Sequence, residues 1–338
     1  MKVNFVSENS TQFSDRVIET LRDLSDDVTV HVFPTEKIIQ EVWESSDLIV
    51  WDWCKTGLQK LTSMPKRCPI VAMGKAGDIL PRLEYTCIRE RCRFRGVPMN
   101  IDHCTTYRTI PAIDWDKIDL LLFESPHLLD EFEDLFPFVK CSKHIVLHRN
   151  FRYETKTDLS LVAALVCRIS VEKDIQFAIE TFRELPEWKL IIQGPINGDS
   201  SDEWMDKTYY ASLRENAPMN VRFVPWGNSY ATYREASIIL STSVSEGIAS
   251  SVMEGMAMGC FPVIRNWPGA RQCYPYANVV ETPVAMTQAL REWEALSLPE
   301  KLLISNNAIQ AIREDVHKGG ENPQLFVSLI KGVVDCFS

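Results

Sequence analysis

Two glutamates frame the segment of this sequence that is best suited to bind a charged, hydroxylated ligand. Glu246 and Glu254 are eight residues apart within Ser241–Ile264, which is predicted to form a strand, a loop, a helix and a second strand. Gly247 lets the loop backbone approach a ligand closely. The N–H groups of residues 249–252, at the start of the expected helix, favour an anion together with the helix dipole. A phosphate there, flanked by carboxylates that accept hydroxyl protons, is the arrangement that a nucleotide sugar requires.

A structural interpretation of the same residues stays open. Ser251 and Glu254 have the spacing of a capping box, in which the glutamate side chain only bonds back to the start of its own helix. Glu246, taken alone, fits a solvated acid of a loop. The spacing by itself therefore does not decide between a binding site and local helix capping.

Two cations form a second candidate cluster. Arg168 ends the first strand of the second half of the chain, and Lys173 begins the next expected helix. A cation at a helix N-terminus opposes the helix dipole, at a cost of a few tenths of a kcal/mol, and an anion bound between the two side chains would remove that conflict. The alternative is that Lys173 is a solvated surface lysine, with Glu172 and Asp174 offsetting the dipole.

Short apolar strands alternate with amphipathic helices along the chain, which predicts parallel sheets with helices on both faces. The first set of expected strands is Lys2–Ser7, Val28–Phe33, Leu48–Trp51, Ile70–Met73, Asp119–Phe123 and Ile145–His148. The second set is Leu161–Val166, Leu190–Gln193, Val221–Val224, Ile238–Ser241 and Phe261–Ile264. Between the two sets, Arg149–Asp158 is polar and aperiodic, which indicates a linker. Two open α/β domains would then form a cleft at the carboxyl ends of their strands.

Composition narrows the possible functions. The 338 residues carry 36 basic and 46 acidic side chains, a net charge of −10, which disfavours non-specific binding of nucleic acid. The longest apolar run, Leu161–Cys167, is far shorter than the roughly 20 residues of a membrane span, and the N-terminus lacks a signal peptide, so we expect a cytoplasmic protein. The ten cysteines lack the spacing of a zinc site and are expected to be structural thiols, with no metal bound.

Together these motifs resemble the family 4 retaining glycosyltransferases of the GT-B fold. Arg168 and Lys173 match the family's Arg-x4-Lys, and Glu246 and Glu254 match its Glu-x7-Glu. The similarity covers about residues 160–282. Three further segments resemble the family's strand ending in glycine, its base-binding segment and its helix–turn–strand, namely Leu190–Gly194, Val221–Gly227 and Glu254–Val263.

The resemblance implies a role for each matched residue. Arg168 and Lys173 would hold the diphosphate of a nucleotide-sugar donor without a metal or other cofactor. Glu246 would contact the donor sugar, Glu254 the ribose, and the main chain of Val224–Trp226 the base. The implied donor-binding set is Gly194, Val224, Trp226, Gly247, Ile248, Ala249, Ser250, Ser251 and Glu254.

The resemblance also implies two Rossmann-like domains facing each other across a cleft. We expect an acceptor-binding domain over residues 1–152, a donor-binding domain over 153–322 and a C-terminal helix over 323–338 that packs back on the first domain.

The first domain departs from the family pattern. Where the family has a glycine-rich loop, this chain has Ser7–Ser10 without a glycine. His103 is the best candidate for the histidine that the family places near the donor sugar, although a lone histidine is also common as a structural residue. Its rivals are His127, His144 and His148.

Two features of the first domain could bind the acceptor. The basic cluster Arg89, Arg91, Arg93 and Arg95 could hold a phosphorylated lipid at a membrane surface, or form a merely solvated face. Trp51 and Trp53, with Asp52 between them, end the third expected strand, where their rings could stack on a sugar or pack in the core.

The sequence therefore predicts a retaining glycosyltransferase. It would move a hexosyl or pentosyl group from a nucleotide diphosphate sugar, with UDP or GDP as the expected nucleotide, to a hydroxyl of a glycan, glycolipid or lipid phosphate. Two alternatives stay open: a nucleotide-sugar epimerase, and a partner subunit that binds nucleotide sugar without turning it over.

Overall fold

The computed structural model of the chain consists of two compact units, unit 1 and unit 2. It describes residues 1–7, 15–52, 56–74, 112–145, 151–170, 173–196, 203–244, 246–317 and 323–337. Unit 1 contains the described residues up to 145 and those from 315 onward, and unit 2 contains those from 151 to 314.

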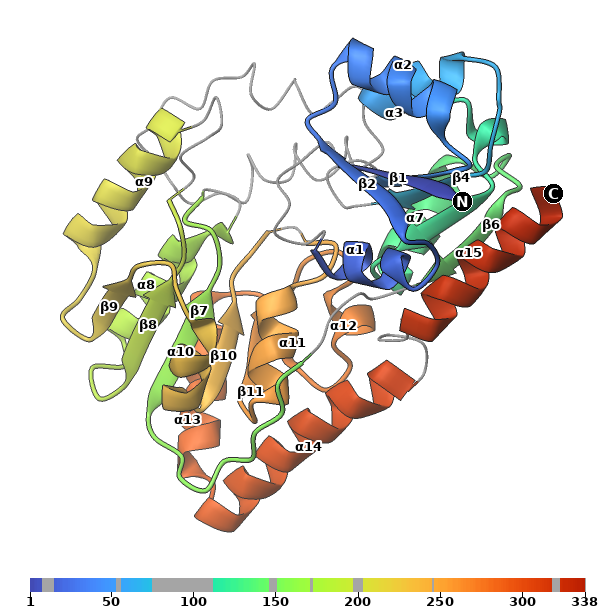
Figure 1. The fold of residues 1–338 in the computed structure, drawn as a ribbon. Helices are drawn as coiled ribbons and strands as arrows, with labels where there is room; N and C mark the ends of the chain where they lie inside the picture. Colours follow the sequence, from blue (N-terminus) through green and yellow to red (C-terminus); the bar gives the residue numbers. More distant parts are fainter. Residues whose placement is uncertain are drawn as a thin grey trace. The chain divides into compact units, whose positions relative to one another are not determined.

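A six-stranded parallel sheet forms the centre of unit 1, in the order β2-β1-β3-β4-β5-β6 (Figure 1). Its strands are β1 (Lys2–Ser7), β2 (Asp27–Val32), β3 (Leu48–Asp52), β4 (Ile70–Gly74), β5 (Leu120–Phe123) and β6 (Ser142–Ile145). Its helical elements are α1 (Asp15–Arg22), α2 (Glu36–Ser45), α3 (Thr56–Ser63), η2 (Trp115–Lys117), α7 (Pro126–Leu135) and α15 (Pro323–Phe337). Side chains alternate across each strand, so the central strands are apolar on both faces and helices cover both.

The last helix of the chain is part of unit 1. Phe326 and Ile330 of α15 are fully buried against Val17 and Leu21 of α1 and against the sheet face that contains Val3. Residues more than 300 positions apart in sequence therefore share one hydrophobic core.

Unit 2 is built around a second six-stranded parallel sheet, in the order β12-β11-β10-β7-β8-β9 (Figure 1). Its strands are β7 (Val162–Val166), β8 (Lys189–Gln193), β9 (Val221–Val224), β10 (Ile238–Ser241), β11 (Phe261–Arg265) and β12 (Asn278–Val280). Its helices are α8 (Ile175–Arg183), α9 (Glu203–Asn216), α10 (Ser229–Glu235), α11 (Ser250–Ala257), α12 (Ala270–Cys273), α13 (Pro283–Ala295) and α14 (Leu298–His317). The strand order reverses between β7 and β10, as in doubly wound dinucleotide-binding sheets.

Helices cover both faces of this second sheet. On one face, Leu165 and Leu240 belong to a core cluster with side chains of α8, α9 and α13. On the other face, Ile239 lies against α11 so closely that Gly255 has no room for a side chain. The close approach brings the start of α11 to the carboxyl end of β10, where the two glutamates are located.

The structure confirms two doubly wound α/β sheets, with most strands within one residue of the sequence prediction. Two edge strands were predicted poorly. The strand expected at Ile145–His148 lies at Ser142–Ile145, and β12 was not predicted. Both are short and partly exposed, so they lack the continuous apolar run that marked the central strands.

Replacing Gly255 by alanine is expected to destabilise unit 2, because the added methyl group would lie 2.7 Å from Cβ and Cγ1 of Ile239. Such overpacking costs about 1–3 kcal/mol. The control is Gly332→Ala in α15, where no described atom lies within 4 Å of the new methyl group and stability should rise. Differential scanning calorimetry measures both changes, and a Gly255→Ala midpoint at or above wild type would contradict the close packing.

Candidate functional site

The predicted donor-site residues of unit 2 gather at one edge of its sheet. Arg168 and Lys173 follow β7, and Glu246 and Glu254 lie on the loop and helix that follow β10. These two strands are neighbours at the point where the strand order reverses. Their connections leave in opposite directions there, so the loops at the carboxyl ends can border a ligand.

Lys173 and Glu246 form an ion pair in this structure. Lys173 Nζ lies 2.5 Å from Glu246 Oε1, and Ser243 Oγ donates to the same oxygen at 2.6 Å. The two charged side chains are only 14% and 15% exposed, so water screens their attraction weakly. The lysine does not begin a helix as predicted, because α8 starts two residues later, at Ile175.

The N-terminus of α11 is open to an anion. The helix begins at Ser250, and its N-cap residue, Ala249, has no side chain that can cap it. The N–H groups of Val252 and Met253 both bond to Ala249 O, so the expected run 249–252 is shorter than predicted. Within the described residues, the N–H groups of Ser250 and Ser251 have no acceptor and remain available to a phosphate.

The capping-box interpretation of Glu254 is wrong. Its Oε2 accepts a hydrogen bond of 2.9 Å from the hydroxyl of Tyr233, on the neighbouring helix α10. Burial, with a smaller contribution from the Glu254 charge, raises the pKa of the Tyr233 phenol well above its usual value, so the hydroxyl stays a donor at neutral pH. Glu254 Oε1 makes no hydrogen bond in the described part of the chain and can accept one from a ligand.

The helix that presents Tyr233 is braced by the segment predicted as a linker. Lys156 Nζ donates to the carbonyl oxygens of Tyr233, Arg234 and Ala236, at the C-terminal end of α10. Glu154 pairs with Arg234 through two hydrogen bonds of 2.7 Å. Residues 151–158 are therefore docked on unit 2 and hold α10 in place.

Gly194 and Arg168 follow the carboxyl ends of the neighbouring strands β8 and β7. A side chain at Gly194 would collide with the carbonyl oxygen of Cys167, 1.6 Å from the position of its Cβ, so only glycine fits. Arg168 is exposed at the same edge. Next to them, Trp226 follows β9 with 51% of its surface exposed, and Val224 is half-buried. The predicted phosphate and base contacts thus share one strand edge.

Several predictions for the first domain lie outside the described residues. His103, His148, Trp53 and the basic cluster Arg89, Arg91, Arg93 and Arg95 belong to this group. Trp51 is fully buried within a core cluster of unit 1, so the idea that its ring stacks on an acceptor is wrong.

Two alternatives to His103, namely His127 and His144, lie in the described part of the chain and have different environments. His127 is buried in the first turn of α7, and burial lowers its pKa. His144 is half-buried on the edge strand β6.

One polar pair in unit 1 was not predicted as a site. Ser7 and Asp52 end β1 and β3, the neighbouring strands where the order of the first sheet reverses. Ser7 Oγ donates to Asp52 Oδ2 at 3.2 Å, and both side chains are buried. The signal in the sequence was a polar residue directly after an apolar run, at the carboxyl end of each strand.

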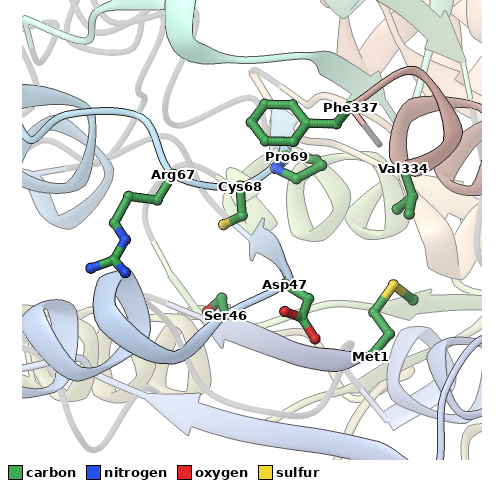
Figure 2. Close-up of a pocket in the computed structure, with 8 residues that line it drawn as sticks. All are labelled: Met1, Ser46, Asp47, Arg67, Cys68, Pro69, Val334 and Phe337. Atoms are coloured by element: carbon green, nitrogen blue, oxygen red, sulfur yellow. The ribbon is translucent and has the colours of Figure 1, made fainter.

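The cavity drawn in Figure 2 contains none of the predicted site residues. It has a volume of about 390 Å³ and lies at the amino ends of β1, β3 and β4, beside the end of α15. Met1, Asp47, Arg67 and Phe337 are among its lining residues (Figure 2). Ligands of doubly wound sheets bind at the opposite, carboxyl edge, so this cavity is not the candidate site.

Among the residues that the structure describes, no group of three or more histidine, cysteine, aspartate or glutamate side chains is placed to hold a metal ion. None of the described helices is long and apolar enough to cross a membrane. Burial raises the pKa of the Cys68, Cys141 and Cys260 thiols to about 11, which makes them poor nucleophiles at neutral pH.

Part of the sequence matches the model of a known protein family. Residues 150–293, less than half of the chain, match the model of the group 1 glycosyl transferases. No curated protein matches the sequence significantly.

Solved structures resemble the whole chain. HepE of Anabaena in complex with UDP and glucose is 14% identical, with a TM-score of 0.68 over 98% of this chain and 100% of that chain. HepE in complex with UDP-glucose is 13% identical, with a TM-score of 0.67 over 100% and 99% of the two chains. Sucrose-phosphate synthase of Thermosynechococcus elongatus is 12% identical, with a TM-score of 0.67 over 98% and 100%. The chain has the GT-B fold, as predicted.

Removing both members of the Lys173–Glu246 pair should cost less stability than the sum of the two single removals. Lys173→Met leaves a mostly buried carboxylate with Ser243 alone, and we expect a loss of about 1–2 kcal/mol. The double variant Lys173→Met/Glu246→Gln should recover at least about 0.5 kcal/mol relative to the sum of the single variants. Urea unfolding of the four proteins measures this coupling, and additive changes would contradict a direct ion pair.

Proposed function

We propose that this protein is a retaining glycosyltransferase of family 4 that works without a metal ion. It transfers a sugar from a nucleotide diphosphate sugar, UDP- or GDP-linked, to a hydroxyl of a glycan, glycolipid or lipid phosphate. The observation that carries the proposal is the Lys173–Glu246 pair beside the open N-terminus of α11. The family match over residues 150–293 and the UDP complexes of HepE, a protein of the same fold, support it.

The diphosphate of the donor would bind to the cationic side of this site. Arg168 and Lys173, on the connection after β7, supply positive charge, and the N–H groups of Ser250 and Ser251, at the start of α11, supply hydrogen-bond donors. These groups stabilise the negative charge that grows on the diphosphate as the sugar leaves. That electrostatic role is the one that a divalent cation plays in metal-dependent transferases, so these residues can replace it.

The two glutamates would bind the hydroxyl groups of the donor. Glu254, oriented by Tyr233, accepts hydrogen bonds from the ribose through Oε1. When a phosphate takes over Lys173, Glu246 loses its cation and accepts hydrogen bonds from the sugar hydroxyls instead. The exchange ties the binding of the diphosphate to the positioning of the sugar.

Nucleotide binding should depend on the cationic edge. In a thermal-shift screen with UDP, GDP, ADP, CMP and their sugars, one base is expected to stabilise the protein, by about 2.7 kcal/mol at 100 times its dissociation constant. Arg168→Ala/Lys173→Ala should abolish the shift. Lys189→Ala is the control, because that exposed lysine lies at the amino end of β8, the opposite edge. A shift that survives in the double variant would contradict the assignment of the site.

Product analysis should separate transfer from the alternatives. NMR of the products is expected to show a new glycosidic bond with the anomeric configuration of the donor, unchanged by EDTA. Glu246→Ala and Glu254→Ala should each lower the turnover about 100-fold or more, while Glu235→Ala, an exposed acid paired with Arg222, should not. A new nucleotide sugar formed without acceptor would indicate an epimerase, and binding without turnover a partner subunit.

A further inference from the structure

A buried ion pair lies directly behind the predicted phosphate-binding lysine. Arg265, the last residue of β11, places Nη1 2.5 Å from Oδ2 of Asp174, the residue after Lys173. The two side chains are 8% and 1% exposed. Because isolated charges are costly to bury, each of these side chains holds the other in place.

Asp174 is held in a conformation that its local sequence does not favour. Its φ of 39° and ψ of 53° lie in the left-handed region, which strains the backbone of a non-glycine residue. Aspartate is a preferred N-cap residue, yet at the N-cap of α8 this side chain makes no capping hydrogen bond and turns to Arg265 instead. The conformation therefore depends on the contact with β11.

The same frame also holds the backbone of Lys173. Thr242, just after β10, donates from Oγ1 to the Lys173 carbonyl oxygen at 2.8 Å. Arg265 Nη1 lies 3.4 Å from Thr242 O, and its guanidinium packs over the ring of Phe177 at 5.1 Å. Glu246 lies four residues after Thr242, so these contacts help to hold Lys173 and Glu246 in place relative to each other.

We propose that Arg265 is a positioning residue of the donor site. Through Asp174 it fixes the strained turn that presents the Lys173 ammonium group to Glu246 and, in the donor complex, to the diphosphate. The identity of the ligand, a nucleoside diphosphate, rests on the proposed function. The contacts of Arg265 with Asp174 and Thr242 do not depend on it. Arg265 acts through Asp174 and Thr242, and it need not touch the donor.

The test compares Arg265→Met, Arg265→Lys and Asp174→Asn with wild type. Asparagine tolerates the left-handed conformation and removes only the charge, so it carries the test if Arg265→Met does not fold. Lys66→Met is the control, because it breaks an equally short cation–carboxylate pair, Lys66 Nζ to Asp119 Oδ1 at 2.5 Å, in unit 1. Calorimetry measures the binding of UDP, GDP and ADP, and mass spectrometry measures the acetylation rate of every lysine by an N-hydroxysuccinimide ester.

We expect Arg265→Met and Asp174→Asn to weaken binding of the preferred nucleotide about tenfold or more. Lys173 should be acetylated several-fold faster while other lysines react at the wild-type rate. Arg265→Lys should restore part of both effects, and Lys66→Met should change neither nucleotide binding nor the labelling of Lys173. Wild-type labelling of Lys173 in a folded Arg265→Met or Asp174→Asn protein would overturn the inference, as would uniformly faster labelling of all lysines. If the wild-type protein binds no nucleotide, the proposed function is wrong. The labelling rate of Lys173 in the variants then decides by itself whether Arg265 positions this lysine.

Discussion

The candidate site depends on the order of strands in unit 2, because β7 and β10 are neighbours although more than 70 residues separate them in the sequence. The reversal of strand order at this point sends their following helices to opposite faces of the sheet. The loops between strand and helix are then left uncovered at the carboxyl edge. Lys173 lies on one loop and Glu246 on the other, 2.5 Å apart. Neither local sequence predicts this contact, because it depends on the pairing of β7 with β10.

The electrostatics of this edge follow from what surrounds each charge. Glu246 accepts hydrogen bonds from the Lys173 ammonium group and the Ser243 hydroxyl. Glu254 accepts one from the Tyr233 hydroxyl, and Asp174 accepts one from the Arg265 guanidinium. Each of these three carboxylates therefore has a donor of its own within unit 2, and Lys173 and Arg265 are each paired with a carboxylate before any ligand binds. A diphosphate has to compete with Glu246 for Lys173, which favours ligands that offer several anionic oxygens at once.

The sequence predicted the framework of this site better than its geometry. Alternating apolar runs located the central strands, and the two spaced motifs located the loops between strand and helix. The role of Tyr233 was not predictable, because it depends on α10 packing against α11 across 21 residues of sequence. The same holds for Arg265, whose partner is 91 residues away. Trp51 was ambiguous for another reason: the last residues of a buried strand look alike whether they point to the core or to a ligand.

The location of α15 has a consequence for how the chain acquires its structure during synthesis. The face of the first sheet that contains Val3 is completed by Phe326 and Ile330. Unit 2, by contrast, is encoded entirely between these two parts. During synthesis, the strands of unit 1 leave the ribosome first, but α15 follows only after all of unit 2. Unit 1 can therefore be completed only at the end of synthesis. Until then the nascent chain exposes an apolar strip beside α1, a natural binding surface for chaperones that recognise unfinished cores.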